Sequence, residues 1–310
     1  MITLNLTSLE KSDLKYKIIK FPDGQQQVNI IGWRTHESKE WGSSFCDKAV
    51  QIKSRYNNFM DLELITCATR SLRDLGVKEI HLYTPYFLGS RSDRKFEEGS
   101  NNYLKEVSCP PINDLNFNSV TVMDPHSDVL EACLNNFQKI DNLTVVESFI
   151  SDTNAKLNDF VLVSPDGGSL KKIYKIAEKI NYNGEIIVCS KHRNEEGKLT
   201  KTDVPLNIAH HEKKNFVIID DICDGGKTFI EIAKEIKNKI HKYNVACENE
   251  ICKSKISLVV THGIFSKGFQ ELAQYFDNIY TTNSYKDLSD IIVFEGEIHP
   301  NSFVKQRNLF

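Results

Sequence analysis

The sequence predicts an α/β fold made of two domains, each with a mainly parallel sheet flanked by helices. Short apolar runs alternate along the chain with longer segments of helical period, which is the pattern of parallel strands joined by helices. The chain has 310 residues, of which 40% are hydrophobic, and this length suffices for two cores of about 150 residues each. We therefore expect two covered sheets in place of one large one.

Individual elements follow from the local pattern. Apolar runs of strand length predict strands at Lys78–Tyr83, Val120–Met123, Phe160–Val163, Glu185–Cys189, Phe216–Ile219, Lys255–Val260 and Asn278–Thr281. Apolar residues three and four apart predict helices at Asp61–Leu75, Leu170–Ile180, Thr228–His241 and Phe269–Tyr275. The stretches Glu97–Asn116 and Asn194–Glu212 show neither pattern, and we expect long functional or mobile loops there.

Composition limits the class of partner. The chain carries 39 Lys and Arg against 42 Asp and Glu, a net charge of -3, so it lacks the basic excess typical of nucleic-acid-binding domains. No apolar run approaches the roughly 18 residues that cross a bilayer, and residues 1–9 do not resemble a secretory signal. The 8 Cys are spread singly, without the paired spacing of a zinc site. We expect a cytoplasmic protein with no nucleic-acid or membrane partner.

Two strand ends carry acidic residues before a helix. Val120–Met123 leads into Asp124, Pro125 and His126, and the strand at Phe216–Ile219 leads into Asp220 and Asp221. Open α/β sheets bind their ligands at the carboxyl ends of strands, so both places are candidate binding sites. The similarity also hints at an internal duplication.

The second of these strand ends resembles a phosphate-binding loop. Gly225 and Gly226 allow backbone N–H groups to turn toward an anion, and Thr228 can cap the following helix. A Walker A motif is excluded, because Asp221 stands where that motif requires glycine. Asp220 and Asp221 suit the two hydroxyls of a ribose, or a cation bound to them. The alternative is a simple Asp-Gly turn after a strand.

Five further segments show which protein family the chain resembles. They are Tyr83–Lys95, Val122–His126, Leu162–Lys172, Ser190–Arg193 and Thr261–Ser266. Their order and spacing closely resemble the ribose-phosphate diphosphokinase family, also called phosphoribosyl-diphosphate synthetases, from about Phe21 through Ser284.

This resemblance implies two tandem type I phosphoribosyltransferase-like domains. The first would span residues 1–141 and be completed by residues 294–310, and the second would span residues 142–293. The implied reaction is Mg²⁺-dependent transfer of the β,γ-diphosphoryl group of ATP to O1 of ribose 5-phosphate, which gives 5-phosphoribosyl 1-diphosphate and AMP. Such a transfer depends on positioning and electrostatic stabilisation, so no nucleophilic side chain is needed.

The resemblance also implies a role for each matching residue. Lys191 and Arg193 would be the catalytic cations of a loop that closes over the phosphates. The ribose 5-phosphate-binding residues would be Arg193, Asp220, Asp221, Asp224, Gly225, Gly226, Lys227 and Thr228, and the diphosphate loop would be Asp166, Gly167 and Gly168. ATP would be bound by Phe21, Asp23, Gly24, Gln25, Arg91, Ser92, Asp93 and His126, and Mg²⁺ by His126 and Asp166.

The chain departs from the family pattern at three of these positions, and other interpretations stay open. Ser92 replaces a usual Gln, Gln25 a usual Glu, and Gly225 a usual Thr. Lys191 and Arg193 could instead form a solvated basic turn, and His126 could be structural. The chain could also be a non-catalytic regulatory homologue, or a phosphoribosyltransferase that consumes phosphoribosyl diphosphate. The family's Phe21 contact with a neighbouring subunit implies a homo-oligomer, a dimer or an assembly of dimers.

Overall fold

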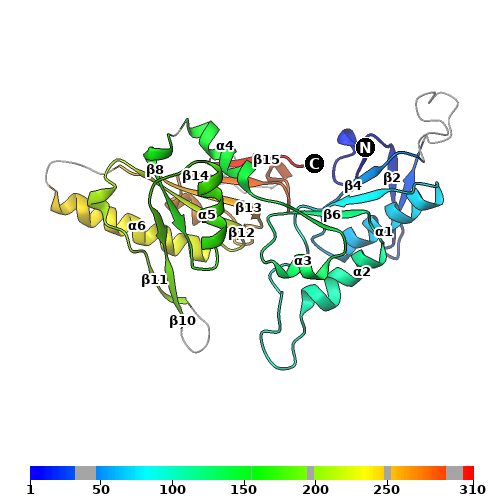
Figure 1. Ribbon diagram of the computed structural model, residues 1–310, viewed down its shortest axis with the longest axis horizontal. Helices are drawn as coiled ribbons and strands as arrows, with labels where there is room; N and C mark the ends of the chain where they lie inside the picture. Colours follow the sequence, from blue (N-terminus) through cyan, green and yellow to red (C-terminus); the bar gives the residue numbers. More distant parts are fainter. Residues whose placement is uncertain (32–46, 155, 194–198, 248–252, 291–302) are drawn as a thin grey trace. The chain divides into compact units, whose positions relative to one another are not determined.

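The computed structural model describes residues 1–31, 47–154, 156–193, 199–247, 253–290 and 303–310 (Figure 1). These residues form two compact units. The first contains Met1–Asp141 together with Leu309–Phe310, and the second contains Asn142–Asn308. Each unit has its own hydrophobic cluster and its own sheet.

The first unit is built on a 5-stranded parallel sheet. Its strands run in the order β1 (Ile2–Asn5), β4 (Val50–Lys53), β5 (Ile80–Tyr83), β6 (Ser119–Met123) and β7 (Phe137–Ile140). The helices are α1 (Phe59–Asp74), α2 (Cys109–Asp114) and α3 (Val129–Cys133), and β2 (Tyr16–Lys20) and β3 (Gln26–Ile30) form a separate antiparallel hairpin.

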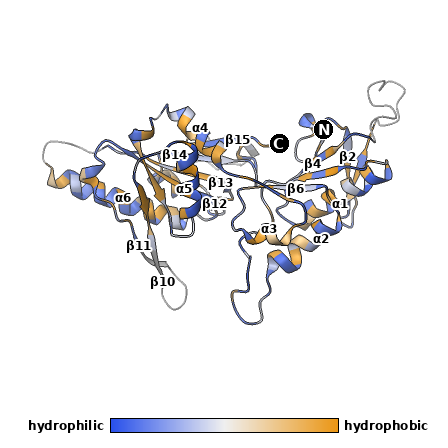
Figure 2. Cartoon of the chain, viewed as in Figure 1, coloured by the Kyte–Doolittle hydropathy of each residue, from blue (hydrophilic) through white to orange (hydrophobic). Residues whose placement is uncertain are grey.

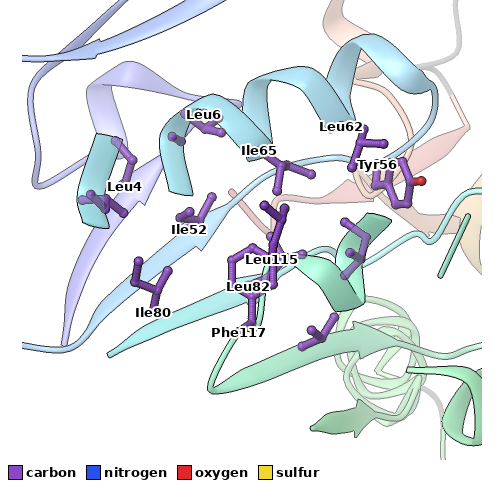
Figure 3. Close-up of a cluster of buried hydrophobic side chains, with 14 of the residues drawn as sticks. Leu4, Leu6, Ile52, Tyr56, Leu62, Ile65, Ile80, Leu82, Leu115 and Phe117 are labelled. Atoms are coloured by element: carbon purple, nitrogen blue, oxygen red, sulfur yellow. The ribbon is translucent and has the colours of Figure 1, made fainter. Parts of the chain in front are cut away.

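Helix α1 shows why these segments fold as they do. Asn58 caps it, because its side chain accepts hydrogen bonds from the backbone N–H groups of Met60 and Asp61 at 2.8 and 3.1 Å. The helix buries Ile65 and its neighbours at helical spacing against alternate residues of the strands, such as Ile52 and Leu82 (Figure 3). The parallel sheet and α1 thus share one apolar core.

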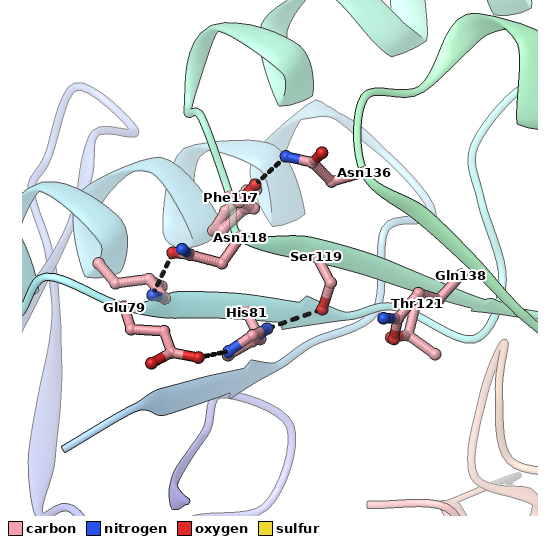
Figure 4. Close-up of polar contacts among 9 residues, drawn as sticks. Glu79, His81, Phe117, Asn118, Ser119, Thr121, Asn136 and Gln138 are labelled. Carbon is pink, nitrogen blue, oxygen red and sulfur yellow. Dashed lines mark hydrogen bonds and ion pairs between the residues drawn. The ribbon is translucent and has the colours of Figure 1, made fainter.

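Polar contacts fix the register between β5 and β6. The side chain of Asn118 accepts a hydrogen bond from the backbone N–H of Ile80 at 2.9 Å, and His81 Nδ1 lies 2.7 Å from Ser119 Oγ (Figure 4). His81 Nε2 lies 2.9 Å from a carboxylate oxygen of Glu79. A slip of one residue would break the contacts with Asn118 and Ser119 and turn the apolar residues to the other face.

The second unit contains a 6-stranded parallel sheet. The order is β15 (Val304–Arg307), β14 (Asn278–Thr282), β13 (Ile256–Gly263), β12 (Asn215–Cys223), β8 (Phe160–Ser164) and β9 (Ile186–Val188). Its helices are α4 (Leu143–Thr153), α5 (Leu170–Lys179), α6 (Lys227–Ala246) and α7 (Leu272–Tyr275), and β10 (Ser190–Arg193) pairs with β11 (Leu199–Asp203) as an antiparallel hairpin. Figure 2 shows hydrophobic and hydrophilic residues together along α6, as expected of a helix with one buried face.

The expected strands and helices are confirmed to within a few residues, but two expected loops are not irregular. The stretch Glu97–Asn116 contains a π-helical turn at Leu104–Ser108 that continues into α2, because Leu104, Cys109 and Ile112 are buried. The described part of Asn194–Glu212 contains β11 and a 3-10 turn at Ile208–His210.

The expectation for residues 294–310 is wrong where the structure describes them. Residues 294–302 lie outside the described residues. Strand β15 adds to the second sheet by pairing with β14, and Ile279 aligns with Val304. Only Leu309 and Phe310 group with the first unit. There the backbone oxygen of Phe310 accepts a hydrogen bond from Lys11 Nζ at 2.7 Å.

Candidate functional site

The acidic pair lies inside strand β12, near its carboxyl end. The sequence predicts that the strand ends at Ile219, but pairing with β13 continues through Asp220, Ile222 and Cys223. Asp221 is only 4% exposed. The strand is longer than predicted because Ile222 and Cys223 are also buried and prolong its apolar contact.

The residues after β12 form a tight loop that is held from the neighbouring strand. Ser266, which follows β13, donates a hydrogen bond from its hydroxyl to Asp224 Oδ1 at 2.6 Å, and its backbone N–H donates to Asp224 O at 3.1 Å. Gly226 has φ +79°, a conformation that L side chains rarely adopt. The two expected glycines therefore do stand in a turn between a strand and a helix.

Helix α6 begins at Lys227, so Thr228 is not its cap. Gly226 occupies the cap position, and no side chain there accepts a hydrogen bond from the first turn. The first turn of a helix leaves backbone N–H groups without partners inside the helix, and these attract anions. Lys227 is exposed and Thr228 is half-buried at this end of the helix. The geometry fits a bound phosphate.

The expected diphosphate loop follows the neighbouring strand, β8. Asp166 Oδ1 accepts hydrogen bonds from the backbone N–H groups of Gly168 and Ser169 at 3.0 and 3.1 Å. The N–H of Gly168 is thus used inside the loop. Asp166 folds the loop that precedes α5.

Ser169 connects the loop shaped by Asp166 to strand β12. Its hydroxyl donates a hydrogen bond to Asp220 Oδ1 at 2.9 Å, and the backbone N–H of Asp221 donates to the same oxygen at 3.0 Å. Burial, followed by the neighbouring Asp221 carboxylate, raises the pKa of Asp220, whereas Ser169 and Lys172 oppose the rise. Two adjacent carboxylates in little water are costly without a ligand, so this strand end favours cations and hydroxyl donors.

Lys191 and Arg193 lie on strand β10, which pairs with β11 to form an antiparallel hairpin. Backbone pairing aligns Lys191 with Thr202 and Arg193 with Leu199, with an irregularity after His192. Both residues therefore belong to an antiparallel hairpin and not to an irregular loop. Their side chains lie outside the described part of the chain.

In the first unit, Phe21–Gln25 forms the turn of the β2–β3 hairpin. The backbone N–H of Gln25 donates to Asp23 Oδ1 at 3.1 Å, and Gly24 has φ +94°. The ring of Phe21 is 40% exposed, which leaves it accessible to a ligand or to another chain. Asp23 and Gly24 shape the turn, and Phe21 is the residue that it displays.

Arg91, Ser92 and Asp93 follow β5, and His126 follows β6. Arg91 and His126 are exposed. Asp93 forms an ion pair with Arg94 at 3.3 Å, and its backbone oxygen accepts a hydrogen bond from Asn102 at 2.8 Å. Both segments leave parallel strands at their carboxyl ends, as expected for ligand-binding loops.

The expected metal residues lie in different units, His126 in the first and Asp166 in the second. Among the described residues, no group of three or more His, Cys, Asp or Glu side chains is arranged to hold a metal ion.

Sequence reasoning missed two residues at this site. Ser169 joins the loop after β8 to strand β12, and Ser266 joins the residues after β13 to the loop after β12. Each lies in a segment that the sequence singled out, Leu162–Lys172 and Thr261–Ser266. The signal was a serine at a strand-to-helix loop, but serine there is equally compatible with an ordinary turn.

Comparisons with known proteins show what the chain is similar to. A model of the phosphoribosyl transferase domain matches residues 134–247. The ribose-phosphate pyrophosphokinase of Mycoplasmopsis pulmonis is 30% identical over 230 residues, 74% of this chain and 65% of that protein. The one from Pyrococcus furiosus is 28% identical over 276 residues, 86% of this chain and 85% of that protein. Along most of its length, the chain is similar to ribose-phosphate pyrophosphokinases.

A solved structure supports the fold of the whole chain. The phosphoribosylpyrophosphate synthetase of Mycobacterium smegmatis superposes with a TM-score of 0.73 and covers 99% of this chain and 94% of its own. Its sequence identity is 14%, so this match shows the fold alone. The expected α/β class, with phosphoribosyltransferase-like domains in tandem, is thereby confirmed. Among the described residues, no helix is long and apolar enough to cross a membrane.

Proposed function

We propose that this chain transfers the β,γ-diphosphoryl group of ATP to O1 of ribose 5-phosphate, releasing AMP. One observation carries the proposal. The hydroxyl of Ser169 joins Asp220, on the candidate ribose strand, to the loop shaped by Asp166. A sugar phosphate and a diphosphate can therefore be bound at the carboxyl ends of adjacent strands, β12 and β8. The similarity to curated ribose-phosphate pyrophosphokinases supports the same reaction.

In this proposal the second unit positions the acceptor. The 5-phosphate lies at the start of α6, where uncapped backbone N–H groups and Lys227 favour an anion. Asp220 and Asp221 accept hydrogen bonds from the ribose hydroxyls and so orient O1. The loop between Asp166 and Ser169 receives the transferred diphosphate. Lys191 and Arg193 neutralise the charge that spreads over the diphosphoryl group during transfer.

The first unit supplies the nucleotide-binding residues. Phe21 offers an exposed aromatic ring for stacking on adenine, and Arg91 offers an exposed guanidinium for the phosphates or the base. A ring displayed on a hairpin turn also suits a nucleotide held by a neighbouring copy. We propose a homo-oligomer, a dimer or an assembly of dimers, for this reason.

The oxygen-rich donor set suits Mg²⁺. Magnesium prefers carboxylate and phosphate oxygens, and the largely desolvated carboxylates of Asp220 and Asp221 are costly until a cation or ligand lies beside them. Asp166 in the second unit and His126 in the first are each proposed as a ligand of Mg²⁺. When bound, Mg²⁺ neutralises the triphosphate and so lowers the repulsion that an incoming hydroxyl meets.

The test is to mix the purified protein with ATP, Mg²⁺ and ribose 5-phosphate and to follow nucleotides by chromatography. We expect AMP to appear only when all three are present, and EDTA to abolish its formation. Formation of ADP would indicate an ordinary kinase and contradict the proposal. Absence of turnover together with binding to an active relative would indicate the regulatory homologue. Consumption of phosphoribosyl diphosphate with a free base would indicate a phosphoribosyltransferase.

A further inference from the structure

Two cysteines that are far apart in the sequence meet between helices α2 and α3 of the first unit (Figure 1). Cys109 is the first residue of α2 and is 1% exposed, whereas Cys133 is the last residue of α3 and is half-buried. The Cys109 thiol donates a hydrogen bond to the sulfur of Cys133. Both thiols are free, and neither belongs to the candidate site described above.

A second residue of α2 fixes this contact. Asn113 lies one turn after Cys109, so both side chains leave the same face of the helix. The side-chain amide of Asn113 donates to the backbone oxygen of Cys133 at 2.9 Å, and its side-chain oxygen accepts from the backbone N–H of Asn135 at 2.9 Å. The end of α3 is thus held against the face of α2 that carries Cys109.

The two thiols differ in their access to solvent. Burial, followed by the contact with Cys133, raises the pKa of Cys109 to about 12, so Cys109 is protonated and shielded at neutral pH. Cys133 is the more accessible of the two, and an oxidant in solution meets it first. Within the described residues no group of three or more His, Cys, Asp or Glu side chains is arranged to hold a metal ion, so the chemistry of this pair is that of a dithiol.

We propose that Cys109 and Cys133 form a reversible disulfide when the protein meets a peroxide. The sulfur of Cys133 attacks the peroxide, so that an S–O bond forms, the O–O bond breaks and one water leaves. The sulfur of Cys109 then attacks the resulting sulfenic acid, the S–O bond breaks, and the Cys109 proton leaves with the hydroxyl group as a second water. The two thiols are oxidised by two electrons, and the peroxide is reduced to two waters.

The disulfide joins the helices that follow two candidate nucleotide-binding loops. Helix α2 belongs to the segment that holds the loop after β5, because Asn102 donates to the backbone oxygen of Asp93 at 2.8 Å and the N–H of Leu104 donates to that of Ser92 at 3.1 Å. Helix α3 follows the loop that carries His126. An effect of the disulfide on nucleotide binding rests on the proposed function, whereas its formation does not.

The test is treatment of the reduced full chain with hydrogen peroxide, followed by alkylation of the remaining thiols and mass spectrometry of non-reduced peptides. We expect one dominant cross-linked pair that contains Cys109 and Cys133, with a mass about 2 Da below the sum of the two thiol peptides. Dithiothreitol should restore both thiols. Cross-links that join other cysteines instead, or oxidation of Cys133 beyond the sulfenic acid while Cys109 stays a thiol, overturn the proposal.

Variants separate the two steps. In Cys109→Ala no neighbouring thiol resolves the sulfenic acid, so dimedone, which labels sulfenic acids, should label Cys133 about fivefold more than in wild type. Cys67→Ala is the matched control, because Cys67 is also half-buried in the first unit but its thiol donates to the backbone oxygen of Gln26 at 3.5 Å. It should leave the cross-link unchanged. Equal labelling of Cys133 in wild type and Cys109→Ala overturns the proposal, and the wild-type cross-link remains a test that needs no variant.

Discussion

Ser169 shows how much of a site can depend on one small residue. Its backbone N–H donates to Asp166 and its hydroxyl donates to Asp220, so two carboxylates from different strands are held by the same serine. The hydroxyl also opposes the rise in the pKa of Asp220 that burial causes. The acidic residues are recognisable by type in the sequence, but their connection depends on a contact across 51 positions of the chain.

At the candidate catalytic residues, we expect Lys191→Ala or Arg193→Ala to lower kcat by about 10²-fold or more, by analogy with the loss of an oxyanion-stabilising donor. Interactions made mainly in the transition state lower kcat and leave ground-state binding nearly intact. Dissociation constants of ATP and ribose 5-phosphate should therefore shift only a few-fold, as measured by calorimetry. Lys191→Arg should rescue kcat only in part, since a planar fork differs from a compact ammonium. Near-normal kcat in both alanine variants would mean that Lys191 and Arg193 form a solvated basic turn without a role in catalysis.

His211 makes stability depend on pH. It is 4% exposed and its Nε2 lies 3.3 Å from Glu185 Oε2. Burial lowers the pKa of His211 below 6.5, although Glu185 opposes this. The folded state thus binds fewer protons than the unfolded state just below pH 6.5. The contribution of the neutral His211 ring to the free energy of unfolding is full above pH 6.5 and is lost as the pH falls toward the lowered pKa.

We therefore expect His211→Gln to reduce the decline in the free energy of unfolding between about pH 7 and 5, measured by urea denaturation. The exposed His241 on α6 is a control, because it is not among the groups that act on His211, and His241→Gln should leave the slope unchanged. An identical slope in wild type and His211→Gln would assign the pH dependence to other groups.

At the scale of elements, the turn between β12 and α6 is the part most specific to this site. Gly225 and Gly226 in this turn differ in backbone conformation and in the side chains around them. Gly226 has φ +79°, and an added Cβ would lie 2.9 Å from Leu272 Cδ2. At Gly225 the nearest atom would be Cγ of the flexible Lys267, at 3.1 Å. A Cβ at Gly225 would therefore press on a flexible side chain that can move, whereas Gly226 is required by its backbone conformation and by Leu272.

We expect Gly226→Ala to lower the free energy of unfolding by about 1–3 kcal/mol, because it adds both backbone strain and a contact with Leu272. Gly225→Ala should cost less than half as much but raise the KM for ribose 5-phosphate, since its methyl group narrows the loop. Urea denaturation and steady-state kinetics separate the two effects. Equal stability of the two variants would contradict the assignment.

The elements that the sequence predicts well are those with continuous apolar runs. Strands β8 and β13 are buried along their whole length, and their runs of Val, Leu and Ile are unmistakable. Strand β15 was missed because only Val304 of its four residues is buried. Helix α4 was missed because Val, Ile and Thr favour strands as readily as a helix.

The candidate site shows the same limit. The glycine and aspartate positions of the phosphate loop follow from the sequence, because backbone conformation and charge restrict those positions to few residue types. The start of α6 at Lys227 does not follow from the sequence. Thr228 is the better capping residue by type, but Gly226 occupies the cap position because its φ is positive. The hairpin under Lys191 and Arg193 was also missed, because polar residues conceal its pairing.

At the scale of the whole molecule, the chain forms two separate hydrophobic clusters. Ile65 is fully buried in the cluster of the first unit, and Ile218 is fully buried in that of the second. Each cluster lies between one parallel sheet and its own helices. Stability is therefore expected to be a property of each unit.

Ile65→Ala should lower the stability of the first unit by about 2–5 kcal/mol, because it leaves a cavity in that core. Hydrogen exchange measured by mass spectrometry should then accelerate in peptides from β4 and β5 and remain unchanged in peptides from β12 and β13. Ile218→Ala should give the reverse pattern. Acceleration of all four strands by either substitution would mean that the units unfold as one.

The parallel pairing of the second sheet has a consequence for folding kinetics. Every strand pair that the structure describes in this sheet joins segments far apart in the chain, so none forms as a local hairpin, and closure of long loops slows folding. During synthesis, one edge of β14 exposes unpaired backbone N–H and C=O groups until Val304–Arg307 emerges. A nascent chain stalled before that point would carry an edge competent to recruit other chains. Once β15 pairs, the edge of the sheet becomes a strand of only four residues with exposed Lys305 and Arg307, whose charges oppose pairing with another chain.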